Sequence, residues 1–397
     1  MLRSLFLAPT LFLSLYAFAG QVRLGAEFPL SPTPNFDQSS VVIAEGIPTF
    51  AAWIENNSNV VTSLRGVVTS RTAVDRNSGS GVDVARGSET FLLVWGKDAF
   101  TVVAQRYGLD GSPLDAEPIV IAKVSSPVPQ VNVAWNGANY LVTWSDVSLR
   151  ARRMTESGQL VDAPFVVMAA PTGEFTVDPA VASDGTGFFI AASGYVPILV
   201  DPGPALEPTR IWFAHVGASG AASTATVPIF SAESNSAFNT TGVAITVVEG
   251  QPTIFWVDKR PADPSGNPWT AEPCIHAVQP PSPPRTLRCL DASPLSLTGD
   301  FISLDVAWNG SDFAVVVWNR LGVASAERFD RNLDPIDAAP VELAWNTGLS
   351  RISAVRSGNA VMIAYTRTDA DDDERVFART LEVSDEPPPP RRRGVRH

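Results

Sequence analysis

One short pattern recurs seven times along the chain: an apolar strand, a glycine turn, and a second apolar strand that usually ends on an aromatic residue. The two clearest copies are Val133–Trp144 (VAWNGANYLVTW) and Val306–Trp318 (VAWNGSDFAVVVW). Repeats of about 40 to 65 residues built from short strands are typical of propeller blades. The sequence therefore predicts an all-β fold, a seven-bladed β-propeller of four-stranded blades. Its turn glycines are Gly46, Gly87, Gly137, Gly185, Gly250, Gly310 and Gly358.

Composition agrees with this prediction. A chain of 397 residues is longer than one compact core usually serves, so it must divide into domains or repeat a small unit. Apolar residues make up 45% of the chain, and the 33 prolines and 28 glycines fit short strands separated by many turns.

Large aromatic residues end the second strand of six copies, whereas the fourth copy has Ala192 at this place. We expect these aromatic side chains to fill the space between neighbouring blades rather than to stack on a ligand. They are Trp53, Trp95, Trp144, Trp256, Trp318 and Tyr365.

The last copy lacks a fourth strand, because its three predicted strands, between Arg351 and Val383, run directly into prolines. At the other end of the chain, Val22–Ser31 resembles the fourth-strand segments Leu114–Ala122 and Ile336–Ala344. The sequence thus predicts that the N-terminal strand pairs with the last blade and closes the ring. The stability of the ring should then depend on these first residues.

Residues 1–19 have the features of a signal peptide. Arg3 supplies the positive start, Leu5–Phe18 the apolar stretch, and Ala17 and Ala19 the small residues of a cleavage site. An uncleaved anchor is the alternative, but the apolar stretch is shorter than the ~18 to 20 residues of a membrane span. We expect cleavage near Ala19 and a protein secreted to the periplasm or the cell exterior.

The predicted propeller covers residues 20–386, and residues 387–397 form a proline- and arginine-rich tail. Such a tail is expected to be extended. It could serve as an export address or as a contact to anionic envelope polymers, or it could be a plain disordered end.

The net charge of −12 limits the partners of the folded body. The tail holds four arginines, so the remainder of the chain is more acidic still. An acidic body repels nucleic acid and anionic membranes, so we expect neither as a partner. No later segment is long enough to cross a bilayer. We expect a monomer without a cofactor.

Segments such as 133–146 (VAWNGANYLVTWSD) and 158–168 (GQLVDAPFVVM) resemble the VAWNG-type propeller repeats of secreted proteins from environmental bacteria. The resemblance covers nearly all of the chain after the leader, and it implies a propeller fold. That group has no common activity, so no catalytic residue can be carried over. A sialidase-type Asp-box is not matched, because the nearest segment, Ser183–Thr186, has the wrong spacing and no tryptophan.

Two cysteines, Cys274 and Cys289, flank a proline-rich turn that would place them opposite each other on antiparallel strands. In an exported chain an even cysteine count predicts a disulfide, worth about 3 kcal/mol in the chain-entropy model. The three histidines do not cluster, and no HExxH or GxSxG motif occurs.

The acidic run around Asp369, Asp371 and Asp373 is a weak calcium candidate. Alternate carboxylates can wrap Ca²⁺, but the EF-hand pattern requires glycine where Glu374 stands. A solvated charged loop is the favoured interpretation, and no other metal site is expected.

Two connections between second and third strands are long, Gly194–Thr209 in the fourth copy and Asp258–Glu272 in the fifth. Insertions on one face of a repeat protein often mark its binding surface, although loops also lengthen without function. In the second insertion an aromatic platform with polar neighbours would suit a sugar or a peptide. The candidate binding residues are Lys259, Arg260, Asp263, Asn267 and Trp269.

These features favour a secreted, non-enzymatic propeller that binds a carbohydrate, a protein or a surface component. The alternative is a glycoside hydrolase or polysaccharide lyase, which would need two carboxylates roughly 5 to 9.5 Å apart. Asp258 and Asp263 are the candidates for such a pair. A structural cell-surface protein is the third interpretation.

Overall fold

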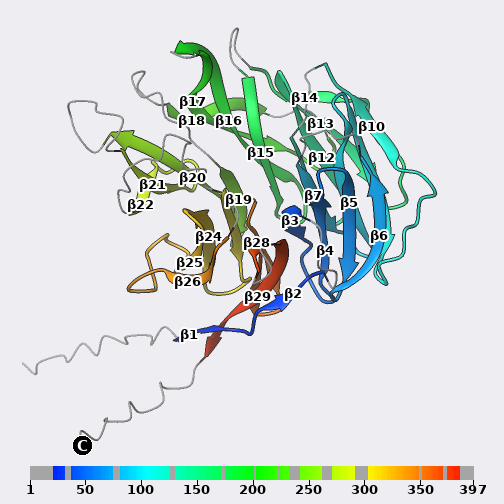
Figure 1. Cartoon of the computed structure of the whole chain (residues 1–397). Coiled ribbons are helices and arrows are strands. Elements are labelled where there is room, and N and C mark those ends of the chain that lie inside the picture. Colours follow the sequence, from blue (N-terminus) through cyan, green and yellow to red (C-terminus); the bar gives the residue numbers. More distant parts are fainter. Residues whose placement is uncertain are drawn as a thin grey trace, which may run out of the picture.

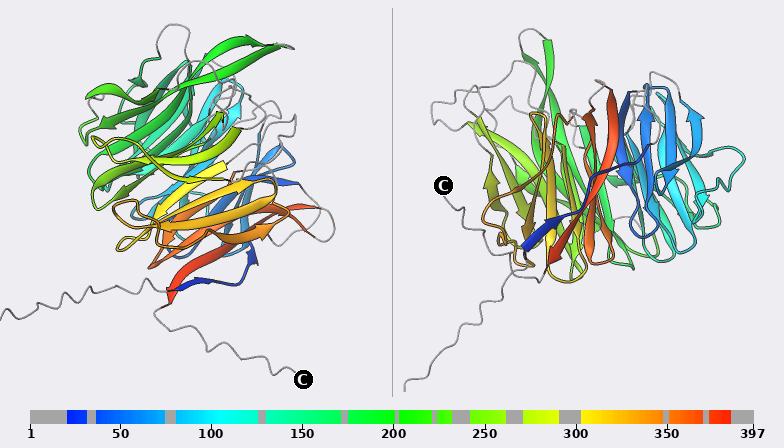
Figure 2. Two further views of the ribbon diagram at one scale, coloured as in Figure 1. Left: turned by 90° about the vertical axis from the view of Figure 1, so that its left-hand side faces the viewer. Right: turned by 60° about the horizontal axis from the view of Figure 1, so that its bottom comes forward.

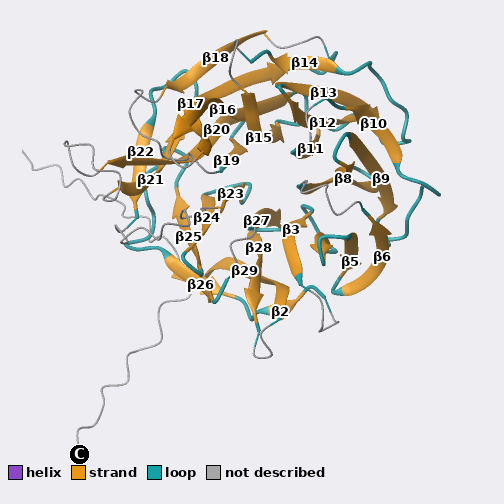
Figure 3. Cartoon of the chain, turned by 45° about the horizontal axis from the view of Figure 1, so that its top comes forward, coloured by secondary structure: helices purple, strands orange, loops and turns teal. Residues whose placement is uncertain are grey.

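The described residues form a ring of seven antiparallel sheets and contain no helix (Figures 1 and 3). This computed structural model describes residues 21–31, 37–74, 81–125, 130–170, 175–200, 203–220, 224–231, 242–261, 271–290, 303–347, 351–369 and 373–384. The predicted seven-bladed propeller is confirmed.

Each blade has its first strand innermost and its fourth strand outermost (Figure 3). Blade 1 contains β3 (Gln38–Ile43), β4 (Phe50–Glu55), β5 (Asn59–Leu64) and β6 (Val67–Ala73). Blade 2 contains β7 (Val82–Arg86), β8 (Thr90–Asp98), β9 (Thr101–Gly108) and β10 (Ile119–Lys123), and blade 3 contains β11 (Val131–Trp135), β12 (Asn139–Asp146), β13 (Ser148–Thr155) and β14 (Phe165–Met168). Blade 4 contains β15 (Phe175–Ser183), β16 (Phe188–Val200), β17 (Gly203–Val216) and β18 (Thr224–Ser231), and blade 5 contains β19 (Val243–Val248), β20 (Gln251–Pro261), β21 (Ala271–Val278) and β22 (Arg285–Cys289). Blade 6 contains β23 (Ser303–Trp308), β24 (Ala314–Arg320), β25 (Val323–Phe329) and β26 (Val341–Trp345), and blade 7 contains β27 (Ser353–Ser357), β28 (Ala360–Thr368) and β29 (Glu374–Ser384), completed by β1 (Gln21–Leu24) and β2 (Phe28–Pro29).

The N-terminal strand closes the ring, as predicted. β1 pairs antiparallel with β29, with Val22 opposite Val383, and β2 continues this pairing (Figure 2). Just before β2, the carboxylate of Glu27 accepts hydrogen bonds from the Tyr365 hydroxyl at 2.7 Å and from Arg367 at 2.7 Å. The first and last described strands thus share one sheet, held by side chains as well as by backbone.

The core is divided into seven apolar clusters, one between each pair of neighbouring blades. In β12, Tyr140, Val142 and Trp144 pack against blade 2, whereas Leu141 packs against blade 4. Both faces of such a strand are buried, which explains why the second strands are almost continuously apolar.

The aromatic residues that end the second strands lie between blades, as predicted, and each is at most 4% exposed. Blade 4, which has Ala192 there, obtains its indole from the neighbouring strand. Trp212 on β17 stands directly opposite Ala192 and packs in the cluster between blades 3 and 4. The interface therefore keeps a tryptophan although the repeat position has lost it.

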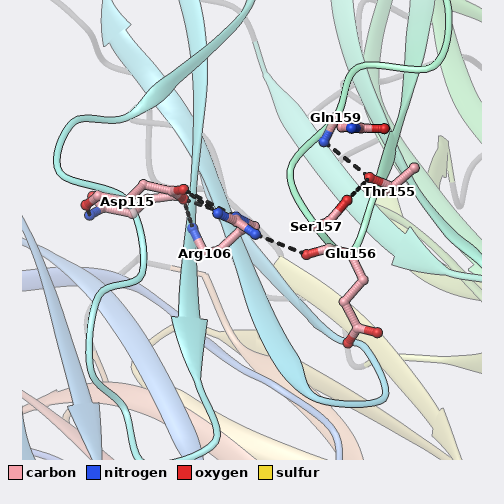
Figure 4. A network of polar contacts seen from close by, with 7 residues as sticks. Arg106, Asp115, Thr155, Glu156, Ser157 and Gln159 are labelled. Atoms are coloured by element: carbon pink, nitrogen blue, oxygen red, sulfur yellow. Dashed lines mark hydrogen bonds and ion pairs between the residues drawn. The ribbon is translucent and has the colours of Figure 1, made fainter.

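A repeated ion pair fixes the outer half of three blades. In each, an arginine of the third strand binds an aspartate nine residues later, in the turn before the fourth strand; the pairs are Arg106–Asp115, Arg153–Asp162 and Arg328–Asp337. Arg106 also donates to the Glu156 carbonyl of the next blade at 3.2 Å (Figure 4). Arg153 likewise donates to the Ala218 carbonyl of blade 4 at 2.6 Å, so these two arginines stabilise the turn and also link neighbouring blades.

The predicted disulfide is present. Cys274 on β21 and Cys289 on β22 are opposite each other in the register, and their sulfur atoms are 2.04 Å apart.

The two long connections differ from the expected loops, because their backbone continues as paired strand. β16 and β17 remain paired up to Val200 opposite Gly203, and β20 and β21 up to Pro261 opposite Ala271. The β16–β17 hairpin extends beyond the neighbouring blades (Figure 2). Most of the length that the sequence suggested as loop in blade 4 is therefore a hairpin.

The predicted signal peptide and the predicted tail lie outside the described residues. Within the part of the chain that the structure describes, no helix has the length and apolarity needed to span a membrane.

Candidate functional site

A cavity of about 440 Å³ lies within the ring, lined by the first strands of all seven blades. Because each first strand crosses the ring from one face to the other, the cavity has two ends. One end lies near the start of the first strands, and the other lies beside the turns that lead to the second strands.

Near the start of the first strands, polar side chains link several neighbouring blades. The Asp83 carboxylate of blade 2 accepts a hydrogen bond from the Val133 amide of blade 3 at 2.8 Å. The Asp305 carboxylate of blade 6 accepts one from the Ala354 amide of blade 7 at 2.8 Å. These residues occupy the same repeat position, since each pairs with the residue just before the aromatic end of its second strand.

Arg351 reaches across this end of the cavity. It donates to the Val82 carbonyl of blade 2 at 2.9 Å, and its guanidinium lies 3.6 Å from Asp83. On blade 4, Asp178 accepts from the Gln130 amide group of blade 3 at 2.7 Å. We call Asp83, Asp178, Asp305 and Arg351 the carboxylate end.

Burial dominates the electrostatics of the carboxylate end. It raises the pKa of Asp305 to about 6, and the negative charge of Asp83 acts in the same direction, against Arg351 and two backbone amides. Burial also raises the pKa values of Asp83 and Asp178, and Arg351 opposes both shifts. The polar atoms here mainly hold the ring together.

At the other end of the cavity, three residues further along each first strand, the side chains form a second ring. We call it the mouth ring; its members, from blade 1 to blade 7, are Glu45, Arg86, Trp135, Ser183, Val247, Trp308 and Arg356. All seven line the cavity. The strands thus present stabilising polar groups at one end and a mixed aromatic and charged ring at the other.

The two tryptophans of the mouth ring are those of the VAWNG motifs. Each is half-buried: Trp135 packs against the cluster between blades 2 and 3, and Trp308 against the cluster between blades 5 and 6. The Trp135 ring centroid lies 4.6 Å from that of Tyr140, which supports it from behind. Both tryptophans therefore pack against an interblade cluster and also line the cavity.

The two arginines of the mouth ring have few partners among the described residues. Arg86 donates to the Ile47 carbonyl at 3.3 Å, and Arg356 donates to the Gly358 carbonyl at 3.0 Å. Glu45 lies in the blade between them. Although Glu45 is exposed, partial desolvation by the surrounding atoms raises its pKa, and the positive charges of Arg356 and Arg86 act against this rise.

The binding residues suggested by the sequence lie elsewhere. Lys259 and Arg260 lie on β20, in the part that continues towards Pro261, whereas Asp263, Asn267 and Trp269 lie outside the described residues. This hairpin joins second and third strands, so it belongs to the face opposite the mouth ring. The binding surface that the sequence suggested for these five residues remains a prediction.

The acidic run is described only in part. Asp369 binds Arg375 at 2.9 Å, Asp371 lies outside the described residues, and Asp373 donates its amide to Asp369 at 3.3 Å. Among the residues described, no group of three or more His, Cys, Asp or Glu is placed to hold a metal ion. The calcium site is thus still a prediction.

The proposed hydrolase pair belongs to the same segment of the sequence, from the end of β20 to the start of β21, as the suggested binding residues. Asp258 lies on β20 opposite Cys274, and Asp263 lies outside the described residues. The pair of Asp258 and Asp263 as catalytic carboxylates therefore stays a prediction.

No protein-family model matches the chain, and no curated protein is similar to it in sequence. Solved structures are similar in fold. The BP39L lectin from Burkholderia pseudomallei aligns with a TM-score of 0.55 and 14% identity, over 86% of this chain and 96% of the lectin. A subtype N11 neuraminidase-like protein of A/flat-faced bat/Peru/033/2010 (H18N11) aligns with a TM-score of 0.49 and 9% identity, over 93% and 97%.

An alpha-L-arabinanase from Penicillium chrysogenum aligns with a TM-score of 0.47 and 10% identity, over 91% of this chain and 98% of the enzyme. These structural neighbours are β-propeller proteins. At such low identity the likeness concerns the fold alone.

Proposed function

We propose that the protein is a non-enzymatic β-propeller that binds a carbohydrate at the mouth ring. The observation that carries this proposal is the placement of Trp135 and Trp308, which line a cavity of about 440 Å³ together with charged side chains. Indole faces pack well against the C–H faces of sugar rings, and a few polar groups then fix the orientation. This volume lies within the range of about 300 to 1,000 Å³ that is usual for small-molecule sites.

The state of the cavity carboxylates favours binding over hydrolysis. A glycosidase needs one carboxylic acid and one carboxylate directed at the substrate. Asp83 and Asp305 instead accept hydrogen bonds from backbone amides of the following blades. An acid already engaged by the scaffold is poorly placed to transfer protons to a ligand.

The similarity to a lectin adds an argument by analogy only, because one fold hosts many functions. It fits a sugar ligand but does not single out the mouth ring.

We further propose that the chain is a secreted bacterial protein with VAWNG-type repeats, released by cleavage near Ala19 and monomeric. The disulfide between Cys274 and Cys289 is compatible with an oxidising compartment. Mass spectrometry of the mature N-terminus, together with the solution mass, tests this part.

The binding proposal is tested by titrating the purified protein with mono- and oligosaccharides in a calorimeter. Trp308→Ala and Trp135→Ala should each weaken binding by about tenfold or more, as expected when a stacking aromatic is lost. Trp269→Ala, which changes the tryptophan of the binding surface suggested by the sequence, is the comparison variant and should leave affinity unchanged.

Other results would redirect the proposal. Loss of binding in Trp269→Ala alone would move the site to the connection between second and third strands of blade 5 that the sequence suggested. Release of shorter sugars during the titration would show a hydrolase or lyase instead. A lower melting temperature with EDTA would support calcium at the acidic run.

A further inference from the structure

Five neighbouring members of the mouth ring form an arc in which the order of residue types is the same from either end. In ring order, from blade 6 through blade 7 to blade 3, they are Trp308, Arg356, Glu45, Arg86 and Trp135. Two arginines therefore flank one glutamate, and a tryptophan stands outside each arginine. Ser183 and Val247, which complete the ring, are uncharged.

The two guanidinium groups keep most of their hydrogen-bonding capacity. A guanidinium has five N–H donors in a planar fork that matches a carboxylate. Among contacts with described residues, Arg86 uses one donor on the Ile47 carbonyl and Arg356 one on the Gly358 carbonyl, and neither forms an ion pair closer than 4.0 Å.

The turn glycines of the preceding blades make room for these arginines. A Cβ added at Gly46 would overlap the guanidinium of Arg86, and one added at Gly310 would overlap that of Arg356. Both glycines also have positive φ angles, 105° and 95°, which other residues rarely adopt. The repeated glycine turn thus supports each arginine against the rim of the cavity.

Charge is distributed unevenly along the cavity. At the carboxylate end the single arginine, Arg351, is engaged by the Val82 carbonyl and faces Asp83. At the mouth ring the arginines outnumber the single carboxylate. An anionic group is therefore attracted to the mouth ring and repelled from the carboxylate end.

From this arrangement we infer that the ligand is an acidic sugar, meaning a carbohydrate that bears a carboxylate. Its sugar ring packs on Trp308 or Trp135, and its carboxylate accepts hydrogen bonds from Arg356 and Arg86. The inference rests on the proposed function, because it specifies the ligand class of the same site. Glu45 competes with the ligand carboxylate for the two arginines.

The test compares two sugars that differ only in the acid group, methyl glucuronide and methyl glucoside, by calorimetric titration of the full protein. We expect the wild type to prefer the glucuronide by about tenfold or more, in line with a charge-assisted bidentate contact. The double variant Arg86→Gln/Arg356→Gln should bind both sugars about equally. Glu45→Gln should bind the glucuronide more tightly than the wild type.

Two further variants keep the test specific. Arg356→Lys retains the charge but not the planar fork, so part of the preference should be lost. Arg331→Gln removes an arginine that pairs with Glu249 outside the cavity, and it should leave the preference unchanged. Melting temperatures confirm that each variant is folded.

Equal binding of the two sugars by the wild type would overturn this inference while leaving the proposed carbohydrate site in place. Absence of binding for both sugars, and for the wider panel, would overturn both. A preference that survives in the double variant would also reject the inference, because the acid would then be recognised elsewhere.

Discussion

Trp135 and Trp144 belong to one β-hairpin of blade 3, yet they have different environments. Trp144 pairs with Val131 at one end of the hairpin, is 1% exposed and packs between blades 2 and 3. Trp135 pairs with Tyr140 at the other end and lines the cavity. The position within the repeat, rather than the residue type, decides whether an indole stabilises the ring or is available to a ligand.

Blade 6 repeats this contrast. Trp318 is 4% exposed in the cluster between blades 5 and 6, whereas Trp308 lines the cavity. An enclosed tryptophan can therefore be compared with a cavity-lining tryptophan both in blade 3 and in blade 6.

The largest expected effect is on stability. Trp144→Ala removes a fully enclosed indole and leaves a cavity between two blades, so unfolding free energy should fall by about 3 to 5 kcal/mol. Trp135→Ala should lower it by less than about 1 kcal/mol, because that side chain is half-buried and already faces open space. Urea unfolding of both variants measures the difference, and similar losses would remove the distinction between the two positions.

A second prediction extends the contrast to the polar residues of the carboxylate end. Asp305 has an ordinary pKa of 3.8 and a folded pKa of about 6, so the folded state retains a proton that the unfolded state releases. Wild-type stability therefore contains a contribution that is present below about pH 4 and lost as the pH rises to about 6, at most about 3 kcal/mol.

Asp305→Asn does not titrate at this position, so the pH dependence isolates the aspartate. The stability of the variant relative to wild type should improve by about 2 to 3 kcal/mol between pH 4 and pH 7. Urea unfolding at several pH values is the measurement. A difference that stays constant with pH would show that Asp305 is ionised in the folded protein over this whole range.

The smallest effect concerns the displaced indole of blade 4. Trp212→Ala should open a cavity and Ala192→Trp should overpack the interface, so each substitution alone destabilises the protein. In the double variant the indole returns to the usual repeat position, and the combined loss should be smaller than the sum by about 1 to 2 kcal/mol. Additive losses would indicate that the two positions are not interchangeable.

Sequence patterns predicted much of the scaffold because the scaffold depends on local rules. Glycine turns such as Gly137 gave the blade count, the missing fourth strand gave the ring closure, and the spacing of Cys274 and Cys289 gave the disulfide. In the VAWNG turn the motif asparagine itself accepts hydrogen bonds, since Asn136 receives the amides of Ala138 and Asn139 at 3.1 and 2.8 Å. Features of this kind are determined within a few residues.

The mouth ring was not predicted, because it depends on which end of a first strand opens onto the axis. Trp135 and Trp308 were present in the motif, but nothing local distinguishes them from the enclosed tryptophans. The long hairpin of blade 4 was expected as a loop because of the length of the connection, and Pro197 and Pro204 give no local indication of strand. Its pairing is supplied by the opposite strand and is therefore not apparent in either segment alone.

One signal was available and unused: an arginine followed nine residues later by an aspartate. It occurs in blades 2, 3 and 6, where it marks the ion pair of the third strand. Such a spacing would have located the third strands and their following turns independently of the glycines.

The pairing of Gln21 with Ser384 makes the order of the blades along the chain partly arbitrary. A short peptide could join these two ends, and the chain could then be opened at the turn between any third and fourth strand. Such circular permutants would have the same neighbours in space but a different final step in folding. In the natural order the first strand can pair only after the last strand has been synthesised. The contact that completes the ring therefore joins residues that are very far apart in the sequence. Moving the chain termini to another blade would change which strand pairs last during folding, but it would leave the central cavity and its lining residues unchanged.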